Sequence, residues 1–513
     1  MSSCSLKRGS LLSNTIFRFI VVILIDLGGI QRISWRRSDH VTTAPWRGRG
    51  CLALDTKPYS NLYNGREDGL YRPSGVDVEY EHRDMEELVR RAGYEIEKHF
   101  VETGDGYVLS VFRIPKGHKD ARSAFAARRT LTNRLKSLFL NTIFHPWLHA
   151  TPSIHDCEDT KRPKVLLQHG LLDSSATWVV NTRKQSLGFL LADAGYDVWM
   201  ANSRGNAFSR NHTGFLPTSK IFWDFTFDDM AKYDLPAVID YIIASGGGNG
   251  DAVGCEPRHM NQEKVALVAH SQGTTISFAA FSSNKELRDK VSLFVALAPA
   301  VYMKYVESIP LKLLAALRAD AFIHILGENE FLPSRKDMSN LFGEFCAVTP
   351  EACVSIITAI CGFSEQNVDA GKLPVYLSYA PSGTSVKNMM HWGQLVRRAS
   401  ESDAQTFAMF DYGEECETAS GQRRDCNQRE YGLERPPEYD LAQLHGPPIA
   451  IFNGLQDKLA DSVDVQTLLD VLPEDVLVYH KNIVGYEHID FTWASNAHSF
   501  VYSDVLELLD MYS

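Results

Sequence analysis

The 513-residue chain is long enough for one large domain with a second lobe or insertions, which excludes a small disulfide-stapled fold. Its 44% hydrophobic and 22% charged residues are typical of a globular protein and exclude wholesale disorder. A formal net charge of −11 gives no reason to expect a nucleic-acid partner.

The first 30 residues follow the order of a targeting segment. Lys7 and Arg8 precede an apolar run over 16–25, and small residues follow it. The run is short for a membrane span, so we predict that residues 1–30 are a cleaved signal peptide or an uncleaved membrane anchor. Residues 31–78 have no sustained hydrophobic period and are predicted to be a poorly ordered lead-in.

The folded part is expected to begin near residue 79, with a short helix and then two strands joined by the turn Gly104-Asp105-Gly106. A basic insertion follows at about 117–160, with no acidic residue from Ala121 to Ala150. Its leucines share one helical face. Such a helix lies on an anionic membrane surface or packs on the domain with a solvated cationic face, and both readings stay open.

Strands and helices then alternate from residue 164 to residue 300, which predicts a mostly parallel sheet with helices on both faces. Leu- and Phe-rich helical segments without alternating strands fill 301–435 and are typical of an inserted helical cap or lid. Strand patterns return at 447–452 and 475–480, before a final helix. We therefore expect a core formed by 79–300 and 436–513, with the cap between the two parts.

The segment VALVAHSQGTT predicts a buried strand over 265–269, an abrupt turn, and a helix. Ser271 lies on that turn, where the hydroxyl of a nucleophilic serine is exposed and the next amide, that of Gln272, faces the attacked group. Small residues must flank such a turn, and Ala269 and Gly273 do so. Ala269 departs mildly from the usual G-x-S-x-G pattern.

An acid and a base come after Ser271 in the chain, in the order serine, aspartate, histidine that this fold uses. A second oxyanion donor comes before it. Asp457 lies just after a predicted strand and is preferred to its neighbours Asp461 and Asp464 as the residue that orients the base. His488, in a loop directly before the final helix, is the best candidate base. The turn His169-Gly170-Leu171 is expected to present the Leu171 amide to the oxyanion, and the His169 side chain is not assigned a catalytic role.

The chain resembles the acid lipase family, the gastric and lysosomal acid lipases within the α/β-hydrolases. The resemblance covers roughly residues 79 to 511 and rests on a series of blocks in the family's order. These are LQHGLLDSSATWVVN, YDVWMANSRGN, FWDFTFDDMAKYDLPAVIDYI, AHSQGTT, YLSYAPSGTSVKNMMHWGQ, FNGLQDKLADSVDV and YEHIDFTW. It implies Ser271, Asp457 and His488 as the triad, Leu171 and Gln272 as oxyanion donors, and a lid over the site.

The nine cysteines include no C-x-x-C pair and no zinc pattern, so no metal is expected. Cys346 with Cys353, and Cys416 with Cys426, are disulfide candidates in an oxidising compartment. The family resemblance also implies a cap disulfide, with Cys346 and Cys353 in its region and Cys361 left free. The single N-x-S/T sequon makes Asn211 a candidate glycosylation site.

The leading hypothesis is a cofactor-free serine hydrolase that cleaves carboxylic esters of neutral lipids, triacylglycerols or steryl esters, at a lipid interface or membrane surface. A thioesterase or a short-chain carboxylesterase is the alternative within enzymes. A non-catalytic α/β-hydrolase binding module is a further alternative. Such modules typically lose a triad residue, whereas here all three are present in order, which argues against this reading. The expected location is the secretory pathway, either lumenal, secreted or lysosome-like, or membrane-associated through residues 1–30. No oligomeric state is predicted.

Overall fold

The computed structural model describes residues 85–118, 162–245, 264–316, 329–332, 349–401, 406–413, 416–417, 423–424 and 426–512. The N-terminal segments 1–30 and 31–78 and most of the basic insertion lie outside these ranges, as does Cys346. The domain boundaries therefore stay predictions. Among the described helices, none is long and apolar enough to cross a membrane.

A nine-stranded sheet forms the centre of the described fold. Its strand order is β1-β2-β4-β3-β6-β7-β12-β13, and β5 pairs with β2 beside this path. Along this path β4, β3, β6, β7, β12 and β13 pair with their neighbours in parallel. The pairs β1 with β2 and β2 with β4 are antiparallel. The bounds are β1 Glu97–Glu102, β2 Tyr107–Ile114, β3 Lys164–Gln168, β4 Asp197–Met200, β5 Asn211–His212, β6 Val265–His270, β7 Val291–Leu297, β12 Ile449–Gly454 and β13 Leu477–Ile483.

Continuous apolar runs account for the central strands, because a strand in the middle of a parallel sheet is buried on both faces. Every residue of β3, β6 and β12 is buried. In register, Ala269 of β6 pairs with Gln168 on one side and Ala296 on the other. The predicted parallel sheet is confirmed, and β6 lies near its middle.

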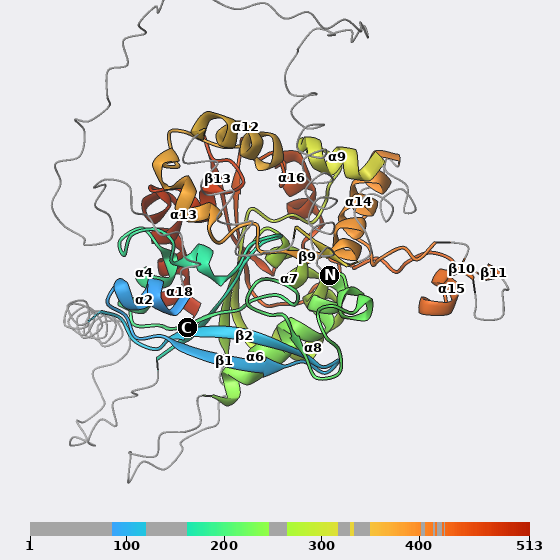
Figure 1. The fold of residues 1–513 in the computed structure, drawn as a ribbon, viewed down its shortest axis with the longest axis horizontal. Helices are drawn as coiled ribbons and strands as arrows, with labels where there is room; N and C mark the ends of the chain where they lie inside the picture. The colour runs from blue at the N-terminus through green and yellow to red at the C-terminus, as the bar shows by residue number, and fades with distance from the viewer. Residues whose placement is uncertain are drawn as a thin grey trace, which may run out of the picture. The chain divides into compact units, whose positions relative to one another are not determined.

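Helices cover both faces of the sheet, as predicted. Figure 1 shows α4 and α18 on one side and α6, α7 and α8 on the other. The sequence 227–244 forms one continuous helical segment, with a π-helical turn, η3, between α5 and α6. The bounds are α2 Met85–Arg91, α4 Leu187–Asp193, α5 Phe227–Asp229, η3 Met230–Asp234, α6 Leu235–Ala244, α7 Gln272–Ser283, α8 Lys285–Asp289, α16 Ser462–Val471, α17 Asp490–Trp493, η5 His498–Tyr502 and α18 Ser503–Tyr512.

The region between β7 and β12 is mainly helical, and in Figure 1 its helices α9, α12 and α14 lie above the sheet, on the side away from the hairpin β1–β2. The bounds are α9 Ile309–Ala316, α12 Pro350–Cys361, α13 Leu373–Leu377, α14 Val386–Glu401 and α15 Cys426–Tyr431. The region also contains short strands that the sequence did not indicate. Two-residue strands pair as β8 (Glu330–Phe331) with β9 (Thr384–Ser385), and as β10 (Cys416–Glu417) with β11 (Arg423–Arg424). Two residues are too few to show an alternating pattern.

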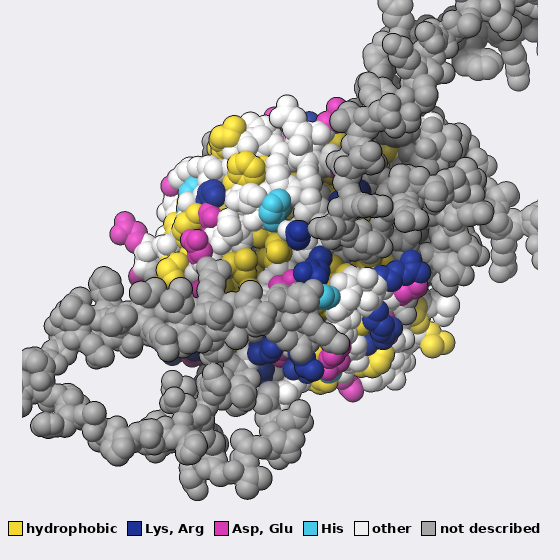
Figure 2. Space-filling model, turned by 90° about the vertical axis from the view of Figure 1, so that its left-hand side faces the viewer, with side chains coloured by type: hydrophobic (Ala, Val, Ile, Leu, Met, Phe, Trp, Pro, Cys, Tyr) yellow, Lys and Arg dark blue, Asp and Glu magenta, His cyan; other side chains and the backbone are white. Residues whose placement is uncertain are grey.

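A buried arginine fixes the loop after β4 to the rest of the core. The Arg204 guanidinium is 1% exposed and bridges the carboxylates of Asp105 and Asp234, each at 2.6 Å. Asp105 belongs to the predicted turn between β1 and β2. On the face of the molecule in Figure 2, the described hydrophobic, basic and acidic side chains are interspersed.

Candidate active site

The connection from β6 to α7 is a sharp, strained turn centred on Ser271. Ser271 has φ 53° and ψ −125°, a left-handed value of φ that non-glycine residues seldom adopt. A Cβ atom on Gly273 would lie 2.7 Å from the carbonyl oxygen of Gln168, so only glycine fits there. Ala269 is fully buried in β6, and its methyl group is accommodated without disturbing the strand pairing.

The turn brings Ser271 against the predicted base and acid. His488 Nε2 lies 2.7 Å from Ser271 Oγ, and His488 Nδ1 lies 2.8 Å from Asp457 Oδ2. All three side chains are buried, with exposed fractions of 8%, 3% and 3% for Ser271, His488 and Asp457. The arrangement is that of a serine, a histidine that faces its hydroxyl, and a carboxylate that fixes the imidazole.

One local expectation about His488 is wrong. The short helix α17 follows His488 directly, and the final helix begins only later. A four-residue helix between two loops gives no periodic signal in the sequence.

The two aspartates that competed with Asp457 have other partners. Asp461 caps α16 by accepting a hydrogen bond from the Val463 amide at 2.8 Å. Asp464 accepts the amides of Lys304 and Tyr305 at 3.1 and 2.8 Å, and so ties α16 to the chain that follows β7.

Asp457 is held by its own loop as well as by the base. Its Oδ1 atom accepts the amides of Leu459 and Ala460, both at 2.8 Å. Among the three aspartates of this segment, only Asp457 is hydrogen-bonded to His488 in the described structure.

The predicted oxyanion donors each follow a residue of the strained turn or of its packing partner: Gln272 follows Ser271 in the chain, and Leu171 follows Gly170. Gly170 packs so closely on Ser271 that an added Cβ would come within 2.8 Å of the serine Cβ. Gln272 is the first residue of α7, so its amide has no partner inside the helix. In the described part of the chain, the Leu171 amide likewise donates no hydrogen bond to another residue. The assignment of these two amides as oxyanion donors stays a prediction; unpaired N–H groups are what such a role requires.

His169 belongs to the scaffold under this loop. Its Nδ1 donates to the Gly170 carbonyl at 2.8 Å, and its Nε2 accepts the Ser203 amide at 3.1 Å and the Asn206 side chain at 3.2 Å. Burial lowers the pKa of His169 to about 4, so the ring is neutral at physiological pH. The ring therefore holds the turn at Gly170 against the chain after β4.

A second histidine holds the backbone at His488, and nothing in the sequence indicated this contact. His270 Nε2 donates to the backbone carbonyl of His488 at 2.9 Å. Burial, with the neighbouring His488 ring as a smaller contribution, lowers the pKa of His270 to about 3. Its position directly before the serine was visible in the sequence, but the partner, 218 residues away, was not.

The structure bears on some of the predictions about the cysteines and the glycosylation sequon. Cys361 is free and buried, as expected. Cys353 and Cys426 are disulfide-bonded. Their pairing with Cys346 and Cys416 stays a prediction, because the partner side chains lie outside the described ones.

Asn211 is exposed in β5, so its predicted modification is sterically accessible. In the described ranges no group of His, Cys, Asp and Glu side chains is arranged to hold a metal ion.

Two carboxyl groups lie beside His488, at the contact with the cap. Glu487 packs against Gly362, the C-cap residue that follows α12, where an added Cβ would clash with the Glu487 carboxyl group. Burial raises the pKa of Glu487 to about 7; Lys458 opposes this rise, and the charge of Asp457 adds to it. Burial also raises the pKa of Asp490 to about 6. These groups are protonated more readily in the folded state than in the unfolded chain.

The raised pKa of Glu487 predicts a protein that is more stable in mild acid. Its stabilising contribution is complete below the unfolded pKa and is lost as the pH rises through about 7. We expect Glu487→Gln to raise the free energy of unfolding by about 1 kcal/mol at pH 8 and to leave it nearly unchanged at pH 4, after allowance for partial exposure. Denaturant unfolding at both pH values measures this difference. The exposed Glu474 provides the control Glu474→Gln; equal pH dependence in both variants would contradict the assignment.

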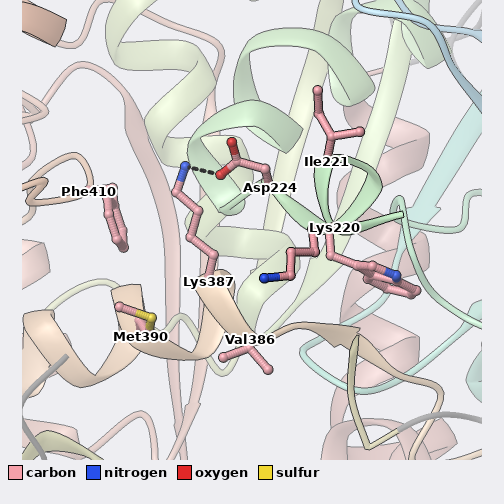
Figure 3. A pocket seen from close by; sticks show the side chains of 8 residues that line it. Lys220, Ile221, Asp224, Val386, Lys387, Met390 and Phe410 are labelled. Atoms are coloured by element: carbon pink, nitrogen blue, oxygen red, sulfur yellow. Dashed lines mark hydrogen bonds and ion pairs between the residues drawn. The ribbon is translucent and has the colours of Figure 1, made fainter. Parts of the chain in front are cut away.

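A pocket of about 360 Å³ lies between η2 (Lys220–Trp223) and the first turns of α14. In Figure 3 the Lys387 ammonium group points to the carboxylate of Asp224, with Nζ and Oδ1 2.7 Å apart. The lining residues are Lys220, Ile221, Trp223, Asp224, Val386, Lys387, Met390 and Phe410. The lining includes none of Ser271, His488 and Asp457, so we do not assign the reacting ester to this pocket.

The fold and the Ser271 turn define an α/β-hydrolase. Two family models match the chain: a partial alpha/beta-hydrolase lipase region over residues 85–182, and the alpha/beta hydrolase fold over 163–320. The predicted fold class is therefore confirmed.

Curated relatives match over most of the chain. Gastric triacylglycerol lipase of Rattus norvegicus is 36% identical over 87% of this chain and 96% of its own, and that of Homo sapiens is 37% identical over 83% and 90%. Lysosomal acid lipase/cholesteryl ester hydrolase of Rattus norvegicus is 36% identical over 86% and 94%. The chain belongs to the acid lipase family. Membership confirms the predicted enzyme class, a lipase-type carboxylic ester hydrolase, and the gastric and lysosomal relatives imply a secreted or lysosomal protein.

Proposed function

We propose that this protein hydrolyses carboxylic esters of neutral lipids, triacylglycerols or steryl esters, with Ser271 as the nucleophile. The observation that carries the proposal is the hydrogen-bonded series Ser271 Oγ, His488 and Asp457, with contacts of 2.7 and 2.8 Å. The substrate class follows from relatives named for triacylglycerol and cholesteryl ester hydrolysis. No cofactor is invoked.

Each step of the hydrolysis is assigned to a group of the site. His488 Nε2 takes the proton of Ser271 as Oγ attacks the acyl carbonyl, and Asp457 stabilises the imidazolium that forms. The amides of Leu171 and Gln272 bind the oxyanion of the tetrahedral intermediate. His488 then gives its proton to the departing alcohol. Water, activated by the same base, releases the fatty acid and regenerates the serine.

Exposed apolar side chains around the carboxyl ends of the strands support action at a lipid interface. Tyr305 follows β7, Leu455 follows β12 and Val484 follows β13, with exposed fractions of 46%, 41% and 77%. Leu313 of α9 and Ile360 of α12 add 37% and 39% exposed surfaces on the cap. Exposed apolar groups near a buried site are suited to a lipid surface.

The remaining assignments complete the proposal. The disulfides Cys346–Cys353 and Cys416–Cys426 stabilise the cap, and a glycan at Asn211 marks passage through the secretory pathway. Residues 1–30 direct the chain into that pathway, as a signal peptide or as a membrane anchor.

Substrate preference is tested by comparing the turnover of four esters by the full chain. We expect hydrolysis of emulsified trioleoylglycerol or cholesteryl oleate to exceed, by at least about tenfold in kcat/KM, that of a soluble short-chain ester and of an acyl thioester. Burial of a long acyl chain in the transition state is the physical reason. Preference for the soluble ester or the thioester would replace the proposal with one of those two activities.

A further inference from the structure

The side chain of Gln272 reaches away from the strained turn and into the cap. Gln272 Oε1 accepts two hydrogen bonds from α14: one from Trp392 Nε1 at 2.7 Å and one from Asn388 Nδ2 at 2.8 Å. All three side chains are essentially sealed from solvent, with exposed fractions of 2% for Gln272 and Trp392 and 0% for Asn388. Asn388 and Trp392 are four residues apart and so share one face of the helix.

The chemistry of these groups fixes the orientation of the amide. An indole N–H is a donor only, so the atom of Gln272 that faces Trp392 must be the carbonyl oxygen. The same oxygen then requires Asn388 to present its NH₂ group. The other end of the Gln272 amide faces the sulfur of Met230 at 3.8 Å, which is at most a weak acceptor. The two donors on α14 are therefore the strong polar partners of this side chain.

Both donors are themselves held in place. The backbone amide of Asn388 donates to Ser385 Oγ at 2.9 Å, and Ser385 in turn donates to the Phe225 carbonyl at 2.6 Å. The Trp392 ring packs against the Phe227 ring, with centroids 5.6 Å apart. The donors therefore form a rigid anchor for Gln272.

We infer that Trp392 and Asn388 are positioning residues of the oxyanion hole. They fix the side chain of Gln272 and thereby the direction of its backbone N–H, one of the two donors proposed for the oxyanion. The inference rests on the proposed function, because it assigns a support to that site. It adds a direct link between a cap helix and the reacting centre, since no part of α14 is needed to form the triad itself.

A purely structural contact between cap and core would affect stability alone, whereas a positioning contact must also affect the transition state. Trp392→Phe removes the indole donor and keeps an aromatic ring. Trp223→Phe is the matched control, because Trp223 is also buried and its Nε1 donates at 2.8 Å to the Pro217 carbonyl, not to Gln272. Both variants lose one indole hydrogen bond and a similar volume.

The measurement is the turnover of a soluble chromogenic short-chain ester, together with inhibition by a trifluoromethyl ketone whose tetrahedral adduct places an oxyanion on the serine. For Trp392→Phe we expect kcat to fall about tenfold with KM changed less than about twofold, and the inhibition constant to rise by about the same factor as kcat falls. For Trp223→Phe we expect both constants to stay within about twofold of wild type. Asn388→Ala should give the same pattern as Trp392→Phe, which keeps the test decisive if one variant fails to fold.

A double variant isolates the contact. With Gln272→Met the acceptor is gone, so adding Trp392→Phe should lower kcat by less than about twofold more. The inference is overturned if Trp392→Phe loses no more kcat than Trp223→Phe, or if the inhibition constant does not move. Failure of the proposed function looks different: the wild-type protein would neither turn over the ester nor bind the ketone.

Discussion

Ser271→Ala is expected to lower kcat for ester hydrolysis by about 10⁵- to 10⁶-fold while the protein stays folded. The serine is the only proposed source of the attacking oxygen, so its loss removes the acyl-enzyme route, and the triad acts as a unit. The oxyanion amides of Leu171 and Gln272 remain, which leaves a weak residual acceleration over water.

Stability should change little, because alanine fills nearly the same space at the strained position. The measurement is steady-state hydrolysis of an emulsified triacylglycerol by purified wild type and variant, with thermal unfolding of both as the control. A folded variant with turnover within about tenfold of wild type would contradict the nucleophile assignment.

Asp457→Asn is expected to lower kcat by about 10⁴-fold with little change in KM. The carboxylate accepts the Nδ1–H of His488 at 2.8 Å, which holds the ring in the tautomer that presents a free Nε2 to Ser271. An amide at the same place presents an N–H group that favours the wrong tautomer. The expected loss is in the chemical step, because the substrate does not contact Asp457.

Asp461→Asn is the matched control for this change. It alters the same kind of group four residues away, and asparagine caps a helix about as well as aspartate. We expect its kcat to stay within about threefold of wild type. The choice of Asp457 over its neighbours would be wrong if Asp461→Asn caused the larger loss.

Much of the sheet could be predicted from the sequence because its central strands are buried on both faces and read as short apolar runs. The turn at Ser271 was visible for a similar local reason: a strand, a small residue on each side of the serine, and a helix follow one another directly. Asp457 and His488 were identified by their place after strands, since loops at that edge carry ligand-facing residues.

Other features depend on contacts between distant segments and leave no local pattern. The strands β8 and β9 are each two residues long, and their pairing places Glu330 opposite Ser385, far away in the sequence. The hydrogen bond from His270 to the His488 carbonyl joins residues more than a hundred positions apart in the sequence. The same is true of the hydrogen bonds from α14 to Gln272. Asn388 and Trp392 lie in one of the blocks that carried the family resemblance, but nothing in the sequence indicated what their side chains contact.

The most direct test of the central claim is covalent labelling of the full-length protein with a fluorophosphonate ester, followed by peptide mapping. The account predicts one phosphonyl group per chain, on Ser271, with loss of hydrolysis in proportion to labelling, because an activated serine beside oxyanion donors attacks phosphorus as it attacks an acyl carbon. A protein that hydrolyses lipid esters but is unlabelled, or is labelled on another residue, would contradict it.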